Sequence, residues 1–176
     1  MVHFIPNILS KEECLYLTNR FDIEREKTSS YDDPNSYGKS FGFRPSYNFD
    51  KYLEILKPKV LEFDSSINTL NNVNTYVREY LNDSFLKKHI DRKDISVTIS
   101  ICIESNINKE WPMFAKIDGI EYSFNTNVGD AILLFDADKT IHWRDTLICN
   151  ENERVLQFFL HWIPVNYITK KTKSLL

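Results

Sequence analysis

The chain has 176 residues, a formal net charge of −3 and a pI near 5.8. A chain of this length with 42% apolar residues predicts one globular domain that buries its own core. The slightly acidic balance offers no broad basic surface for the phosphates of duplex nucleic acid, so we do not expect that class of partner. Three cysteines, Cys14, Cys102 and Cys149, match no zinc-binding spacing, and we expect reduced thiols.

The N-terminal residues lack the basic segment and apolar run of a signal peptide, and no stretch approaches the ~20 apolar residues that span a bilayer. We therefore expect a cytoplasmic protein without a membrane partner.

Two helices are predicted before the first strands. Ser10 and Glu13 have the spacing of a capping box, which predicts a helix to about Asp22. A second helix is expected from about Phe49 to Phe63, with Pro58 kinking it or ending it early. Between them, residues 26–48 are rich in Ser, Asn, Gly and Pro and predict a long loop. This loop is either a lid over a substrate cleft or a segment that tucks its aromatic side chains against the core.

From about Asn74 the pattern changes to strands. Isoleucine or valine occupies every second position from Ile95 to Ile103, while the alternating positions are Ser, Thr or Cys, which predicts a strand with one apolar face. Further strands are expected at 75–80, 111–117, 120–125, 130–135, 140–144 and 154–163. Two helices followed by about eight short strands predict a mainly β (α+β) fold, a sandwich or barrel with helical support.

The candidate metal ligands are His89, Asp91 and His142. On an extended segment His89 and Asp91 point to the same side, so that an imidazole nitrogen and a carboxylate oxygen converge. His142 follows the buried strand that begins after Gly129, which would place it opposite this pair. Two histidines and one carboxylate are the facial triad of non-haem iron(II) oxygenases, although zinc accepts similar ligands.

Arg154 opens an otherwise apolar strand. If it points inward it needs an anionic partner, which a dicarboxylate cosubstrate would supply through a guanidinium fork. Alternatively it pairs with Glu151, Glu153 or solvent at the strand end. His161 has the opposite parity along this strand, so we expect a structural or outward-facing side chain.

In these segments the chain resembles the prolyl 4-hydroxylase-like branch of the Fe(II)/2-oxoglutarate dioxygenases. The similar segments are IPNILSKEEC, YLNDSFLKKHID, GDAILLF, IHWRD and ERVLQFFLHW, over roughly residues 3–163. The IHWRD segment is especially similar to phage and marine-bacterial oxygenases. The resemblance implies a double-stranded β-helix (jelly-roll) supported by N-terminal helices, with iron(II), 2-oxoglutarate and O₂ as cofactor and cosubstrates.

By this resemblance His89, Asp91 and His142 match the iron ligands, and Arg154 matches the residue that pairs with the distal carboxylate of 2-oxoglutarate. Tyr80 matches an aromatic residue that hydrogen-bonds the cosubstrate, and Arg144 is an alternative carboxylate partner. The implied reaction is hydroxylation of an unidentified small molecule or peptide, with release of succinate and CO₂.

Two other functions stay open. One is a non-enzymatic β-sandwich binding module, in which the three ligands would not converge. The other is a cupin-like metal enzyme that does not use 2-oxoglutarate, in which they would converge without Arg154 in the same cavity.

Overall fold

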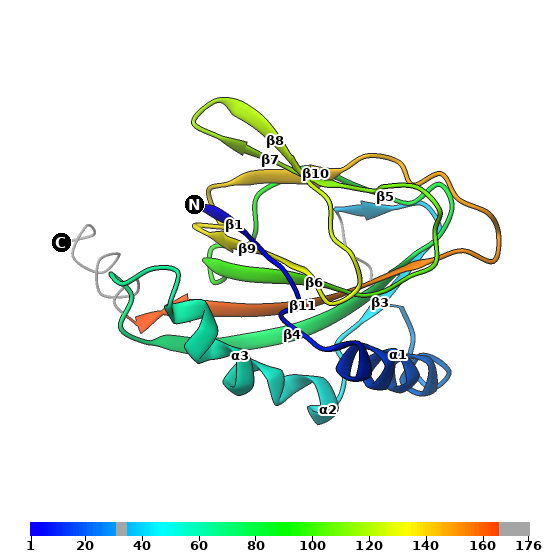
Figure 1. The fold of residues 1–176 in the computed structure, drawn as a ribbon, viewed down its shortest axis with the longest axis horizontal. Coiled ribbons are helices and arrows are strands. Elements are labelled where there is room, and N and C mark those ends of the chain that lie inside the picture. The colour runs from blue at the N-terminus through cyan, green and yellow to red at the C-terminus, as the bar shows by residue number, and fades with distance from the viewer. Residues whose placement is uncertain (31–34, 166–176) are drawn as a thin grey trace.

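Two antiparallel sheets face each other in the computed structural model, which describes residues 1–30 and 35–165, and three helices cover the outer side of the larger sheet (Figure 1). The larger sheet has the strand order β1-β9-β6-β11-β4-β3 and the smaller one β2-β5-β10-β7-β8. The mainly β prediction is confirmed. The strands in chain order are β1 (Val2–Ile5), β2 (Ser36–Tyr37), β3 (Ser40–Phe43), β4 (Leu70–Tyr80), β5 (Phe85–His89), β6 (Val97–Ser105), β7 (Met113–Ile117), β8 (Ile120–Phe124), β9 (Ala131–Phe135), β10 (Ile141–Arg144) and β11 (Val155–Pro164).

The helices are α1 (Lys11–Arg25), α2 (Tyr47–Asp50) and α3 (Tyr52–Leu61). The predicted capping box is confirmed, because Ser10 Oγ accepts from the amide of Glu13 while the Glu13 carboxylate accepts from the amide of Ser10. The predicted second helix is divided into α2 and α3, and Pro58 lies inside α3. No helix in the described part of the chain has the length and apolar character needed to cross a membrane.

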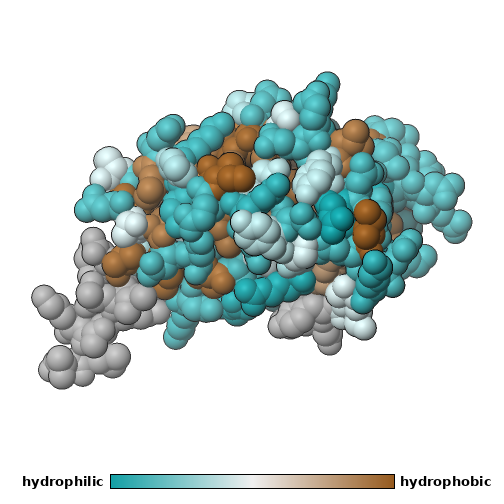
Figure 2. Space-filling view, turned by 90° about the horizontal axis from the view of Figure 1, so that it is seen from below, coloured by the Kyte–Doolittle hydropathy of each residue, from teal (hydrophilic) through white to brown (hydrophobic). Residues whose placement is uncertain are grey.

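The larger sheet has one apolar face, which packs against the helices. The predicted alternation of β6 is confirmed, since its Val and Ile side chains join a buried cluster with Leu17 and Phe21 of α1 and Leu56 and Val60 of α3. Strand β11 contributes its even-numbered residues, Leu156, Phe158, Leu160 and Trp162, to the same cluster. Figure 2 views the molecule from the helix side, where hydrophobic side chains are scattered among hydrophilic ones. The other face of this sheet is turned toward the smaller sheet.

The segment predicted as a long loop, 26–48, contains two short strands. β2 pairs with β5 and β3 pairs with β4, so the loop prediction is wrong for these residues. Phe43 is buried in the main cluster and Phe41 packs against it, as expected if the segment tucks its aromatic side chains against the core. Residues 31–34 lie outside the described part of the chain, and the lid stays a prediction. The strand β1 was also missed, since it is short and lacks alternation, whereas the extended segment expected at His89 is the end of β5.

Candidate metal centre and cavity

Strands β5 and β10 bring two histidines face to face. His89 is the last residue of β5 and His142 the second of β10; they are paired across the antiparallel ladder, with ring centroids 4.2 Å apart. Asp91 follows two residues after His89, and its amide donates to the carbonyl of Ala137. This backbone hydrogen bond fixes the turn that directs the Asp91 carboxylate back toward both imidazoles.

The three predicted ligands lie close together. Oδ1 of Asp91 is 3.7 Å from Nε2 of His89 and 3.6 Å from Nε2 of His142. One ligand atom from each residue can be chosen so that all three lie within 4.8 Å of one another. His142 is buried, whereas His89 and Asp91 are partly exposed, so the cluster has an interior side and an open side.

Hydrogen bonds fix the orientation of each ligand. Nδ1 of His89 is 2.9 Å from the carbonyl oxygen of Lys87, and Nδ1 of His142 is 2.9 Å from that of Thr140. Because a carbonyl only accepts, each Nδ1 carries a proton and each Nε2 keeps its lone pair for a metal. Burial lowers the pKa of His142, more than the Asp91 carboxylate raises it, which keeps this imidazole neutral and able to bind a metal.

Thr98 is a functional candidate that the sequence analysis did not select. Its Oγ1 donates to Oδ2 of Asp91 over 2.6 Å, which leaves Oδ1 facing the histidines. Thr98 lies on the polar face of β6. The predicted alternation of that strand could therefore have identified it as a residue facing the inter-sheet cavity.

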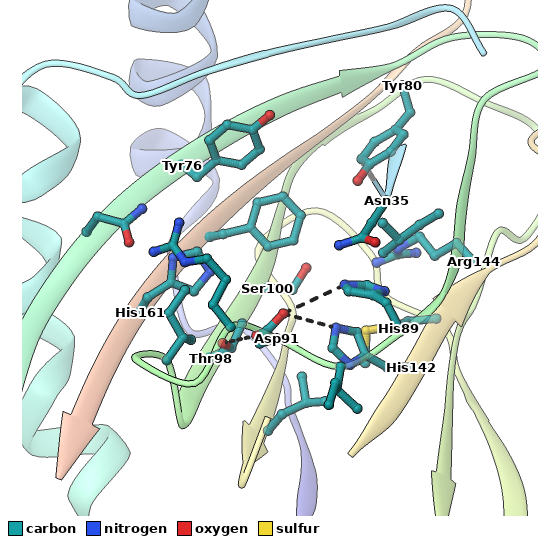
Figure 3. A pocket seen from close by; sticks show the side chains of 18 residues that line it. Asn35, Tyr76, Tyr80, His89, Asp91, Thr98, Ser100, His142, Arg144 and His161 are labelled. Carbon is teal, nitrogen blue, oxygen red and sulfur yellow. Dashed lines mark hydrogen bonds and ion pairs between the residues drawn. The ribbon is translucent and has the colours of Figure 1, made fainter. Parts of the chain in front are cut away.

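A cavity of about 270 Å³ lies between the two sheets and contains the three ligands in its wall (Figure 3). In Figure 3 Tyr80, Asn35 and Arg144 lie on the histidine side of Asp91, whereas Tyr76 and His161 lie on the opposite side. Apolar side chains complete the walls, among them Leu86, Met113, Leu134 and Phe159. The three candidate ligands thus lie between two ends of one cavity.

Arg144 places a buried positive charge in this cavity. It lies two residues after His142 on β10 and is 2% exposed. Nη1 donates to the carbonyl of Trp111 over 2.7 Å, and the guanidinium lies 4.7 Å from the Trp111 ring centroid. Nη2 is buried without a hydrogen-bond partner, and no carboxylate within the described ranges forms an ion pair with Arg144. Burial lowers the pKa of Arg144, more than its electrostatic interactions with Tyr80 and Cys102 raise it.

Tyr80, the predicted cosubstrate contact, lies at the same end of the cavity. It is almost completely buried and packs against Trp111 with ring centroids 4.9 Å apart. The phenol and the Arg144 guanidinium therefore line one end together, as the prediction for Tyr80 requires.

No protein-family model matches the sequence, and a search of the curated proteins found no match. Solved structures do match over almost the whole chain. A prolyl-4-hydroxylase from Pseudomonas putida is 12% identical, with a TM-score of 0.66 and 91% of each chain covered. HygX from Streptomyces hygroscopicus, solved with nickel, 2-oxoglutarate and hygromycin B bound, is 16% identical, with a TM-score of 0.67 and coverage of 93% of this chain and 83% of HygX.

A third match is a prolyl hydroxylase from Trichoplax adhaerens in complex with a hypoxia inducible factor peptide fragment. It is 10% identical, with a TM-score of 0.67 and coverage of 92% of this chain and 83% of the other. The chain has the fold of the 2-oxoglutarate Fe(II) oxygenases. At these identities the likeness concerns the oxygenase fold, and the chemistry has to be argued from the residues of this chain.

Within this oxygenase fold Arg154 does not reach the cavity, which corrects its prediction as the cosubstrate anchor. Its guanidinium forms ion pairs with Asp22 at 2.7 Å, Glu104 at 2.7 Å and Glu79 at 3.1 Å. The hydrogen bond to Asp22 contributes most to raising the pKa of Arg154. The alternative pairing with Glu151 or Glu153 is also not found, because the partners come from α1, β4 and β6.

The reason lies in the helix layer. Arg154 continues the even-numbered side of β11, which packs against the helices, so its side chain extends toward α1. His161, on the odd-numbered side, lines the cavity instead. The prediction that these two side chains oppose each other agrees with the structure, but the assignment of which one points inward was reversed.

Proposed function

We propose that the chain is an Fe(II)- and 2-oxoglutarate-dependent dioxygenase built on a double-stranded β-helix, and that it hydroxylates a small molecule or peptide with release of succinate and CO₂. One observation carries the proposal: His89, Asp91 and His142 converge in the wall of a cavity that Arg144 also lines, and one guanidinium nitrogen of Arg144 is buried without a partner. A metal ion would bind the three converging side chains, and a carboxylate would pair with the Arg144 guanidinium.

The donor set fits iron(II). Two imidazoles with free Nε2 atoms and one carboxylate oxygen leave further coordination positions for other ligands. Neutral nitrogen and anionic oxygen donors suit a divalent ion, and Thr98 holds the Asp91 carboxylate in its orientation. These residues would hold the iron without a change in their backbone hydrogen bonds.

The cavity also fits 2-oxoglutarate, with Arg144 rather than Arg154 as its partner. A buried guanidinium with an unused Nη2 needs an anion, and a carboxylate would accept a charge-assisted hydrogen bond there. Arg144 and His142 are two residues apart on one strand, so an acid bound to Arg144 would extend toward the metal ligands. When both are bound, iron(II) and 2-oxoglutarate would provide the chemistry by which O₂ oxidises the substrate.

The residues of the chain have defined tasks in this reaction. Arg144 and Tyr80 would bind and orient the cosubstrate, while Leu86 and Met113 exclude water from that end of the cavity. The substrate would approach from the opposite end, where the wall is formed by β4 and β11. Because HygX was solved with hygromycin B and the Trichoplax enzyme with a peptide, both a small molecule and a peptide are reasonable substrate classes.

The position of a buried arginine side chain distinguishes the oxygenase from the cupin-like alternative. The ligands converge without Arg154, which taken alone would favour a metal enzyme that does not use 2-oxoglutarate. Arg144, however, supplies the buried cation that Arg154 was expected to supply. The oxygenase proposal therefore has the stronger support.

Anaerobic calorimetry tests the proposal. We expect Fe(II) to bind, and 2-oxoglutarate to bind more tightly once Fe(II) is present. Aerobic incubation with substrate pools should then release succinate, and His89→Ala or Asp91→Ala should abolish this release. His3→Ala, which changes a histidine outside the cavity, is the matched control. Full succinate release by either ligand variant would refute the metal assignment, and Fe(II) binding without any response to 2-oxoglutarate would favour the cupin-like enzyme.

A further inference from the structure

The end of the cavity opposite Arg144 contains a second pair of polar groups that the metal chemistry does not use. Asn74 on β4 and His161 on β11 are direct partners across the antiparallel ladder, and both line the cavity. The β4–β11 register shifts immediately beside this pair, between His161 and Trp162. Such irregularities re-aim side chains, and they are enriched next to active sites.

Both side chains hold an unsatisfied polar atom. Nδ2 of Asn74 donates to the carbonyl of Thr75, which identifies Oδ1 as the atom left over, and Oδ1 is a pure acceptor. Nδ1 of His161 is likewise buried without a hydrogen-bond partner, while a backbone hydrogen bond between Asn74 and the ring raises the pKa of His161 against the larger effect of burial. Leaving two such atoms unpaired costs stability, so a ligand that pairs with both gains a corresponding affinity.

This end of the cavity is electrically neutral where the pair lies. Burial lowers the pKa of His161 to about 4, so the imidazole is uncharged at neutral pH and can act as donor or acceptor. Arg92 also lines the cavity, but its guanidinium donates to both carboxylate oxygens of Asp94. Asp91 faces the histidines and Thr98. The two unpaired polar atoms in this part of the wall are therefore a neutral acceptor and a neutral imidazole nitrogen, both buried.

Aromatic rings form the adjoining wall. The planes of Phe159 and His161 are within 10° of parallel, with centroids 6.4 Å apart, and the Tyr76 ring lies 6.0 Å from Phe159. All three line the cavity, and Tyr76 and His161 lie on the same side of Asp91 in Figure 3. Aromatic rings in a cavity wall favour a flat ligand, because rings stack with little loss of conformational entropy.

We propose that Asn74 and His161 form the substrate-recognition subsite, and that it binds the edge of an uncharged planar amide carried on a flat ring. The amide N–H would donate to Oδ1 of Asn74, and its carbonyl would accept from Nδ1–H of His161. Tyr76 and Phe159 would contact the ring face. This inference rests on the proposed function, since it places the ring beside the iron ligands. The edge occurs both in cyclic lactams and in carboxamides attached to a ring.

Ligand-observed NMR titration tests the subsite on the metal-free protein and on the anaerobic protein with Mn(II) and 2-oxoglutarate. The probes are uracil for the lactam and benzamide for the carboxamide, each compared with its N,N′- or N,N-dimethyl analogue, which lacks the donor. We expect at least one parent probe to bind about tenfold more tightly than its analogue. Binding of uracil alone would identify the lactam as the source, and binding of benzamide alone the carboxamide.

Substitutions assign the effect to the pair. Asn74→Leu and His161→Phe should each weaken the parent probe about tenfold and leave the dimethyl analogue unchanged, whereas Asn71→Leu at an exposed position of β4 should change neither. Retained Mn(II) binding shows that a variant is folded. The inference is overturned if neither parent probe binds, if the analogues bind equally well, or if both subsite variants keep wild-type affinity. If the wild-type protein does not bind Mn(II) or 2-oxoglutarate, the proposed function is refuted instead. The titration of the metal-free protein still tests the subsite in that case.

Discussion

Thr98 donates a 2.6 Å hydrogen bond from Oγ1 to Oδ2 of Asp91, and this contact joins the larger sheet to the metal ligands of the cavity wall. The ladder of β5 and β10 positions both histidines, but Asp91 lies beyond the end of β5. This hydrogen bond from Thr98 therefore helps to orient the carboxylate, together with the hydrogen bond of the Asp91 backbone amide to Ala137.

Thr98→Val should consequently weaken metal binding by about 10- to 100-fold, the usual cost of removing a group that orients a ligand. The substitution keeps the side-chain shape and removes only the hydroxyl. Fe(II) or Mn(II) affinity measured by calorimetry is the test, and Thr98→Ser, which restores the hydroxyl, should recover most of the affinity. Equal metal affinities of the wild type and Thr98→Val would show that Asp91 needs no such support.

Arg144 and Arg154 should respond in opposite ways to the same substitution. Arg144→Met should reduce 2-oxoglutarate affinity at least tenfold while leaving the metal-free protein as stable as before or more stable, because it removes an uncompensated buried charge. The same change at Arg154 should leave 2-oxoglutarate affinity unchanged and lower the free energy of unfolding by about 1–2 kcal/mol, because it leaves Glu79 and Glu104 without this partner.

Calorimetric titration of 2-oxoglutarate and urea denaturation measure the two effects. A loss of cosubstrate affinity in Arg154→Met with none in Arg144→Met would return the anchor to Arg154 and contradict the geometry of the cavity.

The free energy of unfolding should decrease as the pH is lowered, because His161 takes up a proton less readily in the folded protein than in the unfolded chain. The pKa of this imidazole is about 4 in the folded protein, chiefly because of burial, against an ordinary value of 6.5. Between these values the unfolded chain binds a proton that the folded protein does not. The contribution is therefore complete above about pH 6.5 and is lost toward pH 4, with a slope of at most about 1.4 kcal/mol per pH unit.

Urea denaturation of the metal-free protein between pH 7.5 and 5 measures this slope. His142, whose pKa is also lowered, adds to it in the same direction. His161→Phe should make the slope shallower by up to one proton, whereas His3→Phe should have a smaller effect. An unchanged slope in His161→Phe would mean that this imidazole takes up its proton equally in both states.

Gly42 should be intolerant of even a methyl group. A Cβ at this position of β3 would overlap the Tyr76 hydroxyl and lie 2.8 Å from its Cζ and 2.9 Å from Nε of Arg78. Gly42→Ala should cost about 1–3 kcal/mol of stability and displace the Tyr76 ring from the cavity wall. Thermal denaturation checks the cost, and Tyr76→Phe in the Gly42→Ala background should recover part of it. A fully additive double variant would show that the hydroxyl is not the obstacle.

The sequence alone determined which side chains could form the metal site and which segments form the main strands. The spacing of His89 and Asp91 on an extended segment is a local pattern, although Ala137 and Thr98 are needed to orient the Asp91 carboxylate. The alternation of β6 and the capping box of α1 are equally local, since each depends on neighbours within a few residues. The strands β1, β2 and β3 were missed, because their pairing partners are distant in the chain and their own patterns are short.

Only the tertiary structure decided which face of β11 looks into the cavity. Parity places Arg154 and His161 on opposite faces, but it cannot say which face is covered by helices. The helices cover the even side because Leu156, Phe158, Leu160 and Trp162 bury there, so Arg154 meets Asp22 of α1. His161, which lines the cavity, and Gln157, which accepts a hydrogen bond from Ser100, are left on the inner side. The two polar residues among the odd positions were the available signal. The same packing leaves Arg144 as the buried guanidinium beside His142, because position i+2 on β10 shares its inward face.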